Sequence, residues 1–251
     1  MEVYSSLSPV GRVVVLGVGS LIEAQAKDQA LFFDIINLVN RKLFLLIWVL
    51  SILLGPITIL IFILRSQVPL NNLLVINLIQ RVVGLVAFVL LFWQVVLGSF
   101  MQKWIEKLGA WIFKWHLTEG AVAYSLILLH PLALLAFNYV ARHVIDPFYV
   151  FTDFCLMCRT RPEFFYTFGR LSFWLVSAAV LAAKLRTLPW WRENWRKFHI
   201  LNYAVFLLVA VHSFFIGSDS HSFPFVIFYI ISVPIVLYIV AVKLISYFKT
   251  S

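Results

Sequence analysis

Four histidines stand out because each lies in a long apolar stretch of the chain. They form two pairs along the sequence, His116 with His130 and His199 with His212. An ionisable side chain inside an apolar segment of membrane-spanning length is costly and marks a functional site by default. Imidazole nitrogen is also the commonest protein ligand for metal ions. The two pairs therefore predict metal-binding histidines at two levels of a helical bundle.

The composition is that of a polytopic membrane protein. Of the 251 residues, 63% are hydrophobic and 12% are charged, against roughly 25% charged in an ordinary soluble domain. The net charge is +9, but Lys and Arg occur in short clusters between apolar runs. Membrane topology explains such clusters better than a nucleic-acid partner does, so we expect membrane lipid and no nucleic acid as a partner. Residues 1–8 lack the features of a signal peptide, and we expect no processing.

Six apolar segments are long enough to cross a bilayer as helices of about 20 residues. They are 43–64, 73–100, 116–140, 168–188, 199–216 and 225–247. Residues 43–251 are therefore predicted to form one all-α, six-helix transmembrane domain. Residues 1–42 are predicted to form an N-terminal arm, in which the amphipathic pattern of 29–40 suits a helix lying at the membrane surface.

Lys and Arg in the short loops predict the orientation of the spans. The basic residues after the second and fourth spans fall on the same side as the N-terminus; they are Lys103, Lys107, Lys114, Arg186, Arg192, Arg196 and Lys197. We expect this side, with both termini, to be cytoplasmic, in a plasma or inner cell membrane.

This topology makes the third and fifth spans parallel. His116 then faces His199 at the inner level, and His130 faces His212 at the outer level. At about 1.5 Å per residue the two levels are roughly 20 Å apart. Two imidazoles per level are too few for zinc, which takes three or four protein ligands, whereas haem brings four nitrogens and needs only axial ligands. The ligand count therefore predicts two haem groups.

The only two cysteines of the chain bear on the type of haem. Cys158 is followed by Arg159 rather than by histidine, so the covalent attachment motif is lacking and b-type haems are expected. Cys155 and Cys158 lie in an outer loop, where a local disulfide is the default and a free or metal-binding pair is the alternative.

The two histidines of a pair can lie on one face of a regular helix in the first pair but not in the second. A spacing of fourteen residues, from His116 to His130, returns to within roughly 40° of the same helix face. The thirteen residues from His199 to His212 miss by about 140°. The second pair can serve one stack only if its helix is distorted or tilted, or if the two haems are rotated relative to each other.

The third and fifth spans resemble a known family at their histidines. The matching pattern is His116-x3-Gly120 with His130-Pro131, then Trp195-x3-His199-x3-Tyr203 and His212. It resembles the ferric reductase-like transmembrane domain of ferric reductases, NADPH oxidases and the haem membrane subunit of methionine sulfoxide reductase systems. The resemblance covers residues 81–247. It implies an oxidoreductase membrane subunit whose two b haems pass electrons singly to an acceptor outside, such as ferric iron, oxygen or a redox partner protein.

The same resemblance suggests the electron donor, and the positions of basic residues at the ends of the spans suggest further site residues. Many members continue into flavin and nicotinamide domains, so FAD or FMN is expected only in a separate or missing domain. The donor is then a cytoplasmic flavoprotein reductase or a quinol. Arg81 and Arg170 are predicted to bind the propionates of the outer haem, and Gly120 to give a porphyrin room. Arg196 and Lys197 are candidates at the inner haem, with snorkelling to headgroups as the alternative for lysine.

No residue is assigned a catalytic role, because outer-sphere reduction needs none. A proton-coupled transporter is the alternative from another class of protein, since it too places histidines and Glu119 inside the bundle. Such transporters have broken helices or an inverted repeat, and the sequence shows neither clearly.

Overall fold

The structure is a computed structural model that describes residues 38–158 and 160–250, with side chains up to residue 245. Within these ranges the chain is helical and has no strand. Six segments are long and apolar enough to cross a membrane. They are α2 (Arg41–Ser66), α3 (Asn72–Ser99), α5 (Trp111–Arg142), α7 (Arg161–Lys184), the segment Pro189–Ile216, and α10 (Phe225–Thr250). The predicted all-α polytopic bundle is confirmed, and six such helices identify an integral membrane protein.

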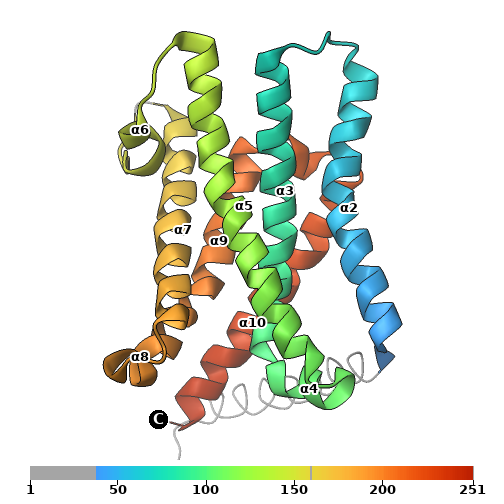
Figure 1. The fold of residues 1–251 in the computed structure, drawn as a ribbon, viewed down its shortest axis with the longest axis vertical. Coiled ribbons are helices and arrows are strands. Elements are labelled where there is room, and N and C mark those ends of the chain that lie inside the picture. Colours follow the sequence, from blue (N-terminus) through green and yellow to red (C-terminus); the bar gives the residue numbers. More distant parts are fainter. Residues whose placement is uncertain (1–37, 159, 251) are drawn as a thin grey trace, which may run out of the picture.

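Shorter helices lie at the two ends of the bundle (Figure 1). At the lower end are α4 (Met101–Leu108) and α8 (Pro189–His199), which leads into α9 (Leu201–Ile216). At the upper end is α6 (Pro147–Phe151), and a 3-10 turn, η2 (Ser218–His221), follows α9.

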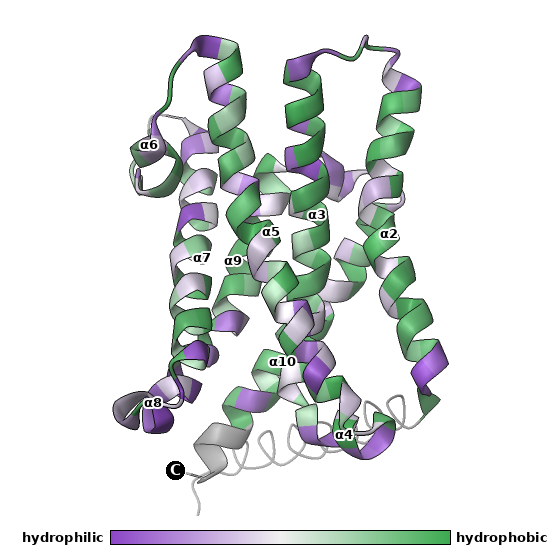
Figure 2. Ribbon diagram, viewed as in Figure 1, coloured by the Kyte–Doolittle hydropathy of each residue, from purple (hydrophilic) through white to green (hydrophobic). Residues whose placement is uncertain are grey.

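The centre of the bundle is α3. In its 18-residue apolar window 67% of the residues are buried, against 11–33% in the other five spans. α2, α5, α9 and α10 pack against α3, and α7 packs against α9. Phe88 of α3 lies 5.0 Å from Phe206 of α9 and 5.5 Å from Tyr229 of α10, ring centre to ring centre. The spans are mostly hydrophobic along their length (Figure 2), and many of their large apolar side chains are exposed, as expected where lipid rather than water is the solvent.

Asparagine caps explain where the first two spans begin. The side-chain oxygen of Asn40 accepts a hydrogen bond from the backbone N–H of Leu43 at 2.9 Å, and that of Asn71 accepts one from Leu74 at 2.8 Å. Such caps satisfy backbone donors that the first helical turn leaves free. Both helices start within two residues of their predicted limits.

The third and fourth spans start earlier than predicted. α7 begins at Arg161 rather than at residue 168, because Pro162 fits a first helical turn and Glu163 is favourable at the positive end of the helix. α5 begins at Trp111, so His116 lies inside the helix instead of at its end. The charged and aromatic residues that were assigned to loops therefore extend the helices beyond the apolar core.

The fifth predicted span is interrupted beside a histidine. α8 ends at His199, and α9 begins at Leu201. The backbone N–H of Ile200 donates to the carbonyl oxygen of Arg196 at 3.0 Å, and that of Tyr203 donates to Ile200 at 3.1 Å. The second bond closes a tighter, three-residue turn. The helix is thus distorted next to His199, which is one of the alternatives that the thirteen-residue spacing left open.

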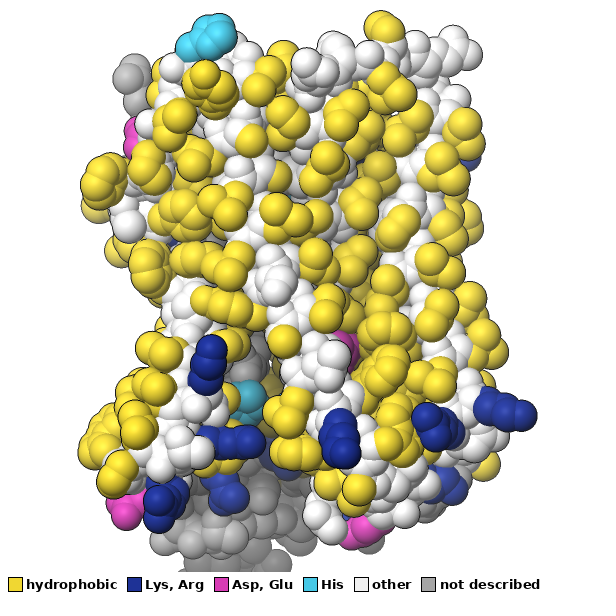
Figure 3. All heavy atoms as spheres, viewed as in Figure 1, with side chains coloured by type: hydrophobic (Ala, Val, Ile, Leu, Met, Phe, Trp, Pro, Cys, Tyr) yellow, Lys and Arg dark blue, Asp and Glu magenta, His cyan; other side chains and the backbone are white. Residues whose placement is uncertain are grey.

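Basic side chains mark one end of the molecule. On the face shown in Figure 3, Lys and Arg gather at the lower end, over α4, α8 and the start of α2. Arg41 and Lys42 belong to α2 rather than to the predicted arm. Residues 1–37 of that arm, and with them most of its predicted amphipathic helix, lie outside the described residues.

Candidate functional site

The two outer histidines line one cavity. His130 of α5 and His212 of α9 both contribute to a cavity of about 460 Å³, whose other walls come from α3, α6, α7 and the η2 turn. Sites for small molecules and cofactors commonly measure about 300–1,000 Å³. The structure therefore brings the predicted outer pair together around a space large enough for a ligand.

Each outer imidazole ring rests on a glycine of a neighbouring helix. A Cβ added to Gly84 of α3 would lie 2.9 Å from Cε1 and Nδ1 of His130. A Cβ added to Gly169 of α7 would lie 2.9 Å from the same atoms of His212. Real Cβ atoms do not approach other heavy atoms this closely, so both rings occupy space that only glycine leaves free.

The same two rings are held by equivalent hydrogen bonds. Nδ1 of His130 lies 3.0 Å from the carbonyl oxygen of Gln80, and Nδ1 of His212 lies 3.0 Å from that of Phe165. A carbonyl oxygen only accepts, so Nδ1 carries the proton and donates it. Nε2 is then the unprotonated nitrogen, which is the form that binds a metal. Both outer histidines are thus held in the tautomer of a metal ligand.

The inner pair is also brought together. The ring centres of His116 and His199 are 6.4 Å apart, with ring planes at 84°. A metal–imidazole bond is about 2.0–2.1 Å and the ring centre lies about 1.1 Å beyond the nitrogen, so imidazoles on opposite sides of one metal ion have centres about 6.3 Å apart. The observed separation fits one metal ion between the rings.

The inner rings are held less firmly than the outer ones. Nδ1 of His116 is buried and has no hydrogen-bond partner among the residues that the structure describes. Nδ1 of His199 lies 3.3 Å from the side-chain amide nitrogen of Asn202, and its ring contacts Trp195.

Two histidines per level leave most of a metal's coordination open. Across residues 38–158 and 160–250 there is no group of three or more His, Cys, Asp or Glu side chains placed to hold a metal ion. A metal ion at either pair must take its remaining ligands from a non-protein group, and a porphyrin supplies four nitrogens. The donor set therefore fits haem and does not fit a tetrahedral zinc site.

Arg81 lines the outer cavity, where its partner is a carboxylate that the sequence did not suggest. Its Nε donates to Oδ2 of Asp219 at 2.7 Å, and its Nη2 donates to Oδ1 of the same residue. The guanidinium also lies 4.0 Å from the ring centre of Phe62. Asp219 is 5% exposed, so this two-bond ion pair is largely shielded from solvent.

Replacing Asp219 with alanine is expected to destabilise the protein by about 3 kcal/mol, because Arg81 is left largely shielded from solvent without its counter-charge. The double variant Arg81→Met with Asp219→Ala is expected to be more stable than Asp219→Ala alone. Thermal unfolding of the purified protein in detergent measures both. Glu106→Gln is the control: it breaks an exposed ion pair with Lys103 and is expected to cost less than about 1 kcal/mol. Equal unfolding temperatures for Asp219→Ala and Glu106→Gln would contradict the prediction.

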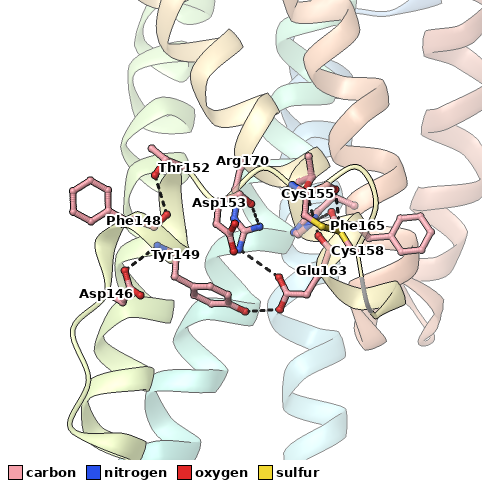
Figure 4. A network of polar contacts seen from close by, with 12 residues as sticks. Asp146, Phe148, Tyr149, Thr152, Asp153, Cys155, Cys158, Glu163, Phe165 and Arg170 are labelled. Atoms are coloured by element: carbon pink, nitrogen blue, oxygen red, sulfur yellow. Dashed lines mark hydrogen bonds and ion pairs between the residues drawn. A yellow bond between two sulfur atoms is a disulfide. The ribbon is translucent and has the colours of Figure 1, made fainter.

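Arg170 is buried in α7 at the wall of the same cavity. Its Nη1 donates to the carbonyl oxygen of Asp153, and its Nη2 lies 3.8 Å from Oε2 of Glu163 (Figure 4). The hydroxyl of Tyr149 donates to Oε1 of Glu163 at 2.9 Å. Burial, together with this hydrogen bond, raises the pKa of Tyr149 to about 12. Tyr149 therefore remains a neutral donor at physiological pH.

The predicted disulfide between Cys155 and Cys158 is present. The hydroxyl of Thr167 accepts a hydrogen bond from the backbone N–H of Cys155 at 3.0 Å and lies 3.1 Å from its carbonyl oxygen. The disulfide loop is therefore attached to α7 next to Arg170.

The other predicted site residues lie on α8 and α5. Arg196 and Lys197 are exposed on α8, where Lys197 donates to the side chain of Asn194 at 2.9 Å. Gly120 faces α3, and a Cβ there would lie 3.0 Å from Oε1 of Gln94. The room that this glycine leaves is thus taken by an amide side chain, not by a flat ring.

The glycines that pack against the histidine rings were not identified from the sequence. Gly84 and Gly98 are fourteen residues apart on α3, the same spacing as His116 and His130 on α5. A Cβ at Gly98 would lie 3.5 Å from Cε1 of His116. Equal intervals of glycine and histidine on neighbouring antiparallel helices are the signal by which this packing can be recognised.

No family model and no curated protein matches the sequence, and no solved structure matches the fold. The class of protein therefore follows from the chain itself. It is an all-α integral membrane protein with two pairs of histidines at two levels of its helical bundle.

Proposed function

We propose that the protein carries electrons across a membrane through two b-type haems. His116 and His199 bind the inner haem, and His130 and His212 bind the outer one. The observation that carries this proposal is the pairing itself: each pair joins α5 to the α8–α9 segment, and the outer rings share a cavity with Nε2 free to bind a metal.

Electron transfer is the activity that such ligation favours. Two axial histidines leave no open position on a haem iron, so the haem supplies one-electron transfer rather than oxygen binding. The residues of the chain fix the ring orientations, keep the outer site among apolar helices and set the two levels roughly 20 Å apart along α5.

The charge distribution supports an orientation for this transfer. Basic side chains gather at the end that carries α4 and α8, and such clusters remain in the cytoplasm in most membrane proteins. We place that end and both termini in the cytoplasm, in the plasma or inner cell membrane. An electron that leaves a negative interior gains about 2.3 kcal/mol per 100 mV of membrane potential, so outward transfer needs no further energy source.

The partners follow from this orientation. A donor at the cytoplasmic end, either a flavoprotein reductase with its own FAD or FMN or a quinol, reduces the inner haem. An acceptor outside, whether ferric iron, oxygen or a redox protein, oxidises the outer one. The protein is on this proposal the membrane subunit of an oxidoreductase of the ferric reductase and NADPH oxidase type.

Absorbance of the purified protein tests the proposal. We expect a Soret band that shifts on reduction with dithionite and about two haems per chain, because each histidine pair completes the coordination of one haem. Haem extracted with acidified organic solvent should leave the protein, since no covalent attachment motif is present. A colourless protein that has been expressed with ample haem would contradict electron transfer and favour a proton-coupled transporter.

A further inference from the structure

Glu119 is a buried carboxyl group inside α5, one of the six spans. Only 4% of its surface is exposed. A carboxyl group at membrane depth is costly to keep and indicates a function. Among residues 38–158 and 160–250, no Lys or Arg side chain forms an ion pair with it. The described part of the chain therefore supplies no counter-charge for this group.

The hydrogen bonds of Glu119 are those of an ionised carboxylate. Its Oε1 accepts from Nε1 of Trp48 at 2.8 Å, and its Oε2 accepts from the side-chain nitrogen of Gln94 at 2.9 Å. The same nitrogen of Gln94 donates to the carbonyl oxygen of His116 at 3.0 Å, which fixes the orientation of the amide because a carbonyl only accepts. Both carboxyl oxygens thus act as acceptors. Both donors are neutral, so they stabilise the negative charge without cancelling it.

Two helices place this charge one turn from the inner site. On α5, Glu119 follows His116 by three residues, which is about 4.5 Å along the axis. On α3, Gln94 precedes Gly98 by four residues, and a Cβ at Gly98 would lie 3.5 Å from Cε1 of His116. His130 lies eleven residues beyond Glu119, which is about 16.5 Å along α5. The carboxylate is therefore much nearer to the inner level than to the outer one.

Buried charge at the outer level has the opposite sign. The side chain of Arg170 is 5% exposed, whereas that of Glu163, 3.8 Å away, is 32% exposed. Water therefore screens this carboxylate more than it screens the guanidinium. The charge of Arg81 is offset by its two bonds to Asp219. The fixed charge is thus negative beside the inner pair and positive in the wall of the outer cavity.

We propose that the carboxylate of Glu119 lowers the reduction potential at the inner site below that at the outer site. The inference rests on the proposed function and adds to it a residue that tunes the inner site. Oxidation of a metal centre adds one positive charge, so a nearby negative charge favours the oxidised form. The interaction energy falls with distance, so the same charge has less effect at the outer site.

This difference in potential gives electron transfer a direction within the protein. One electron moves from the inner level, where the carboxylate of Glu119 disfavours it, to the outer level, where Arg170 favours it. Only the electron moves: no bond forms or breaks in the chain, and Glu119 keeps its charge throughout. Outward transfer is then favoured even where the membrane carries no potential.

Redox titration of the haem absorbance of the purified full chain tests the role of Glu119. We expect Glu119→Gln to raise the equilibrium constant for reduction at the inner site about tenfold or more, which moves the midpoint potential upward by about 59 mV or more. The shift is measured in the His212→Ala background, which retains only the inner pair. In the His116→Ala background, which retains only the outer pair, the shift should be at most about half as large.

Two control variants separate charge from shape. Glu119→Asp keeps the charge but shortens the side chain, and it should change the equilibrium constant at the inner site by less than about threefold. Glu106→Gln removes an exposed carboxylate of α4 and should leave that constant within about twofold. Equal shifts for Glu119→Gln and Glu119→Asp would overturn a role of the charge.

Haem content distinguishes failure of this inference from failure of the proposed function. Two haems per chain, with an unchanged potential at the inner site of Glu119→Gln, would overturn the inference and leave the proposed function standing. A downward shift in Glu119→Gln would overturn it as well, because removal of a negative charge can only favour the reduced form. Absence of haem from the unmodified protein would overturn both.

Discussion

Replacing His212 with alanine is expected to lower the haem content of the purified protein from about two per chain to about one, because each haem needs two axial nitrogens. His212 belongs to the outer pair, and the inner pair lies roughly 20 Å away along α5. The haem that remains should still be reduced by dithionite. Haem extracted into pyridine and measured against protein concentration gives the stoichiometry.

Double variants make the pairing itself testable. His130→Ala with His212→Ala should lose no more haem than His212→Ala alone, because both side chains bind the same group. His130→Ala with His199→Ala should lose both haems. His143→Ala is the control, since His143 is exposed at the end of α5 and should leave the content at about two. Loss of both haems from His130→Ala with His212→Ala would contradict the assignment.

Gly84→Ala is expected to displace the ring of His130 and to remove the outer haem or change its spectrum. The added Cβ would lie 2.9 Å from two atoms of the imidazole. The ring also donates to the carbonyl of Gln80, so it cannot move without losing that bond. Overpacking of this kind typically costs about 1–3 kcal/mol. Redox-difference spectra and thermal unfolding of the purified variant measure the two effects.

Gly98→Ala is the matched control for this substitution. It lies on the same helix and adds the same methyl group, but its Cβ would lie 3.5 Å from His116, an ordinary contact distance. It should retain both haems. Gly169→Ala, by contrast, should resemble Gly84→Ala, because its Cβ would lie 2.9 Å from the ring of His212. Equal spectra for Gly84→Ala and Gly98→Ala would show that the close contact does not hold the ring.

The fold was predictable because a bilayer imposes a length on apolar segments. The six spans and the helical class follow from that single constraint, and the limits of α2 and α3 were found within two residues. The short helices α4 and α8 were predicted to be loops. They contain many charged residues and are too short and too polar to be recognised as spans. Arg161 was likewise assigned to a loop although it begins α7.

The two arginines that line the outer cavity, Arg81 and Arg170, were predictable, and so were the histidines of the candidate site. Their types and spacing led to the pairs that the structure brings together. The hydrogen bonds and ion pairs around the site depend on which helices are neighbours in the bundle. The periodicity of apolar residues along the sequence does not reveal this. Arg81 and Asp219 are separated by 138 residues, and the carbonyls of Gln80 and Phe165 carry no side-chain signal at all. The thirteen-residue spacing left three alternatives open, a distorted helix, a tilted helix or rotated haems, and the interruption at Ile200 could not be located from the residues.

The two histidine levels differ in how firmly the folded chain alone holds the imidazole rings. Both outer rings are tied to a carbonyl and seated on a glycine, so their rotational freedom is lost when the chain folds. At the inner level Nδ1 of His116 has no partner within the described part of the chain, so no hydrogen bond fixes that ring before a ligand binds. Binding at a preorganised site costs less conformational entropy. On the proposed function, newly inserted protein should therefore acquire its outer haem before its inner one, so that the half-loaded chain holds a centre on the acceptor side alone.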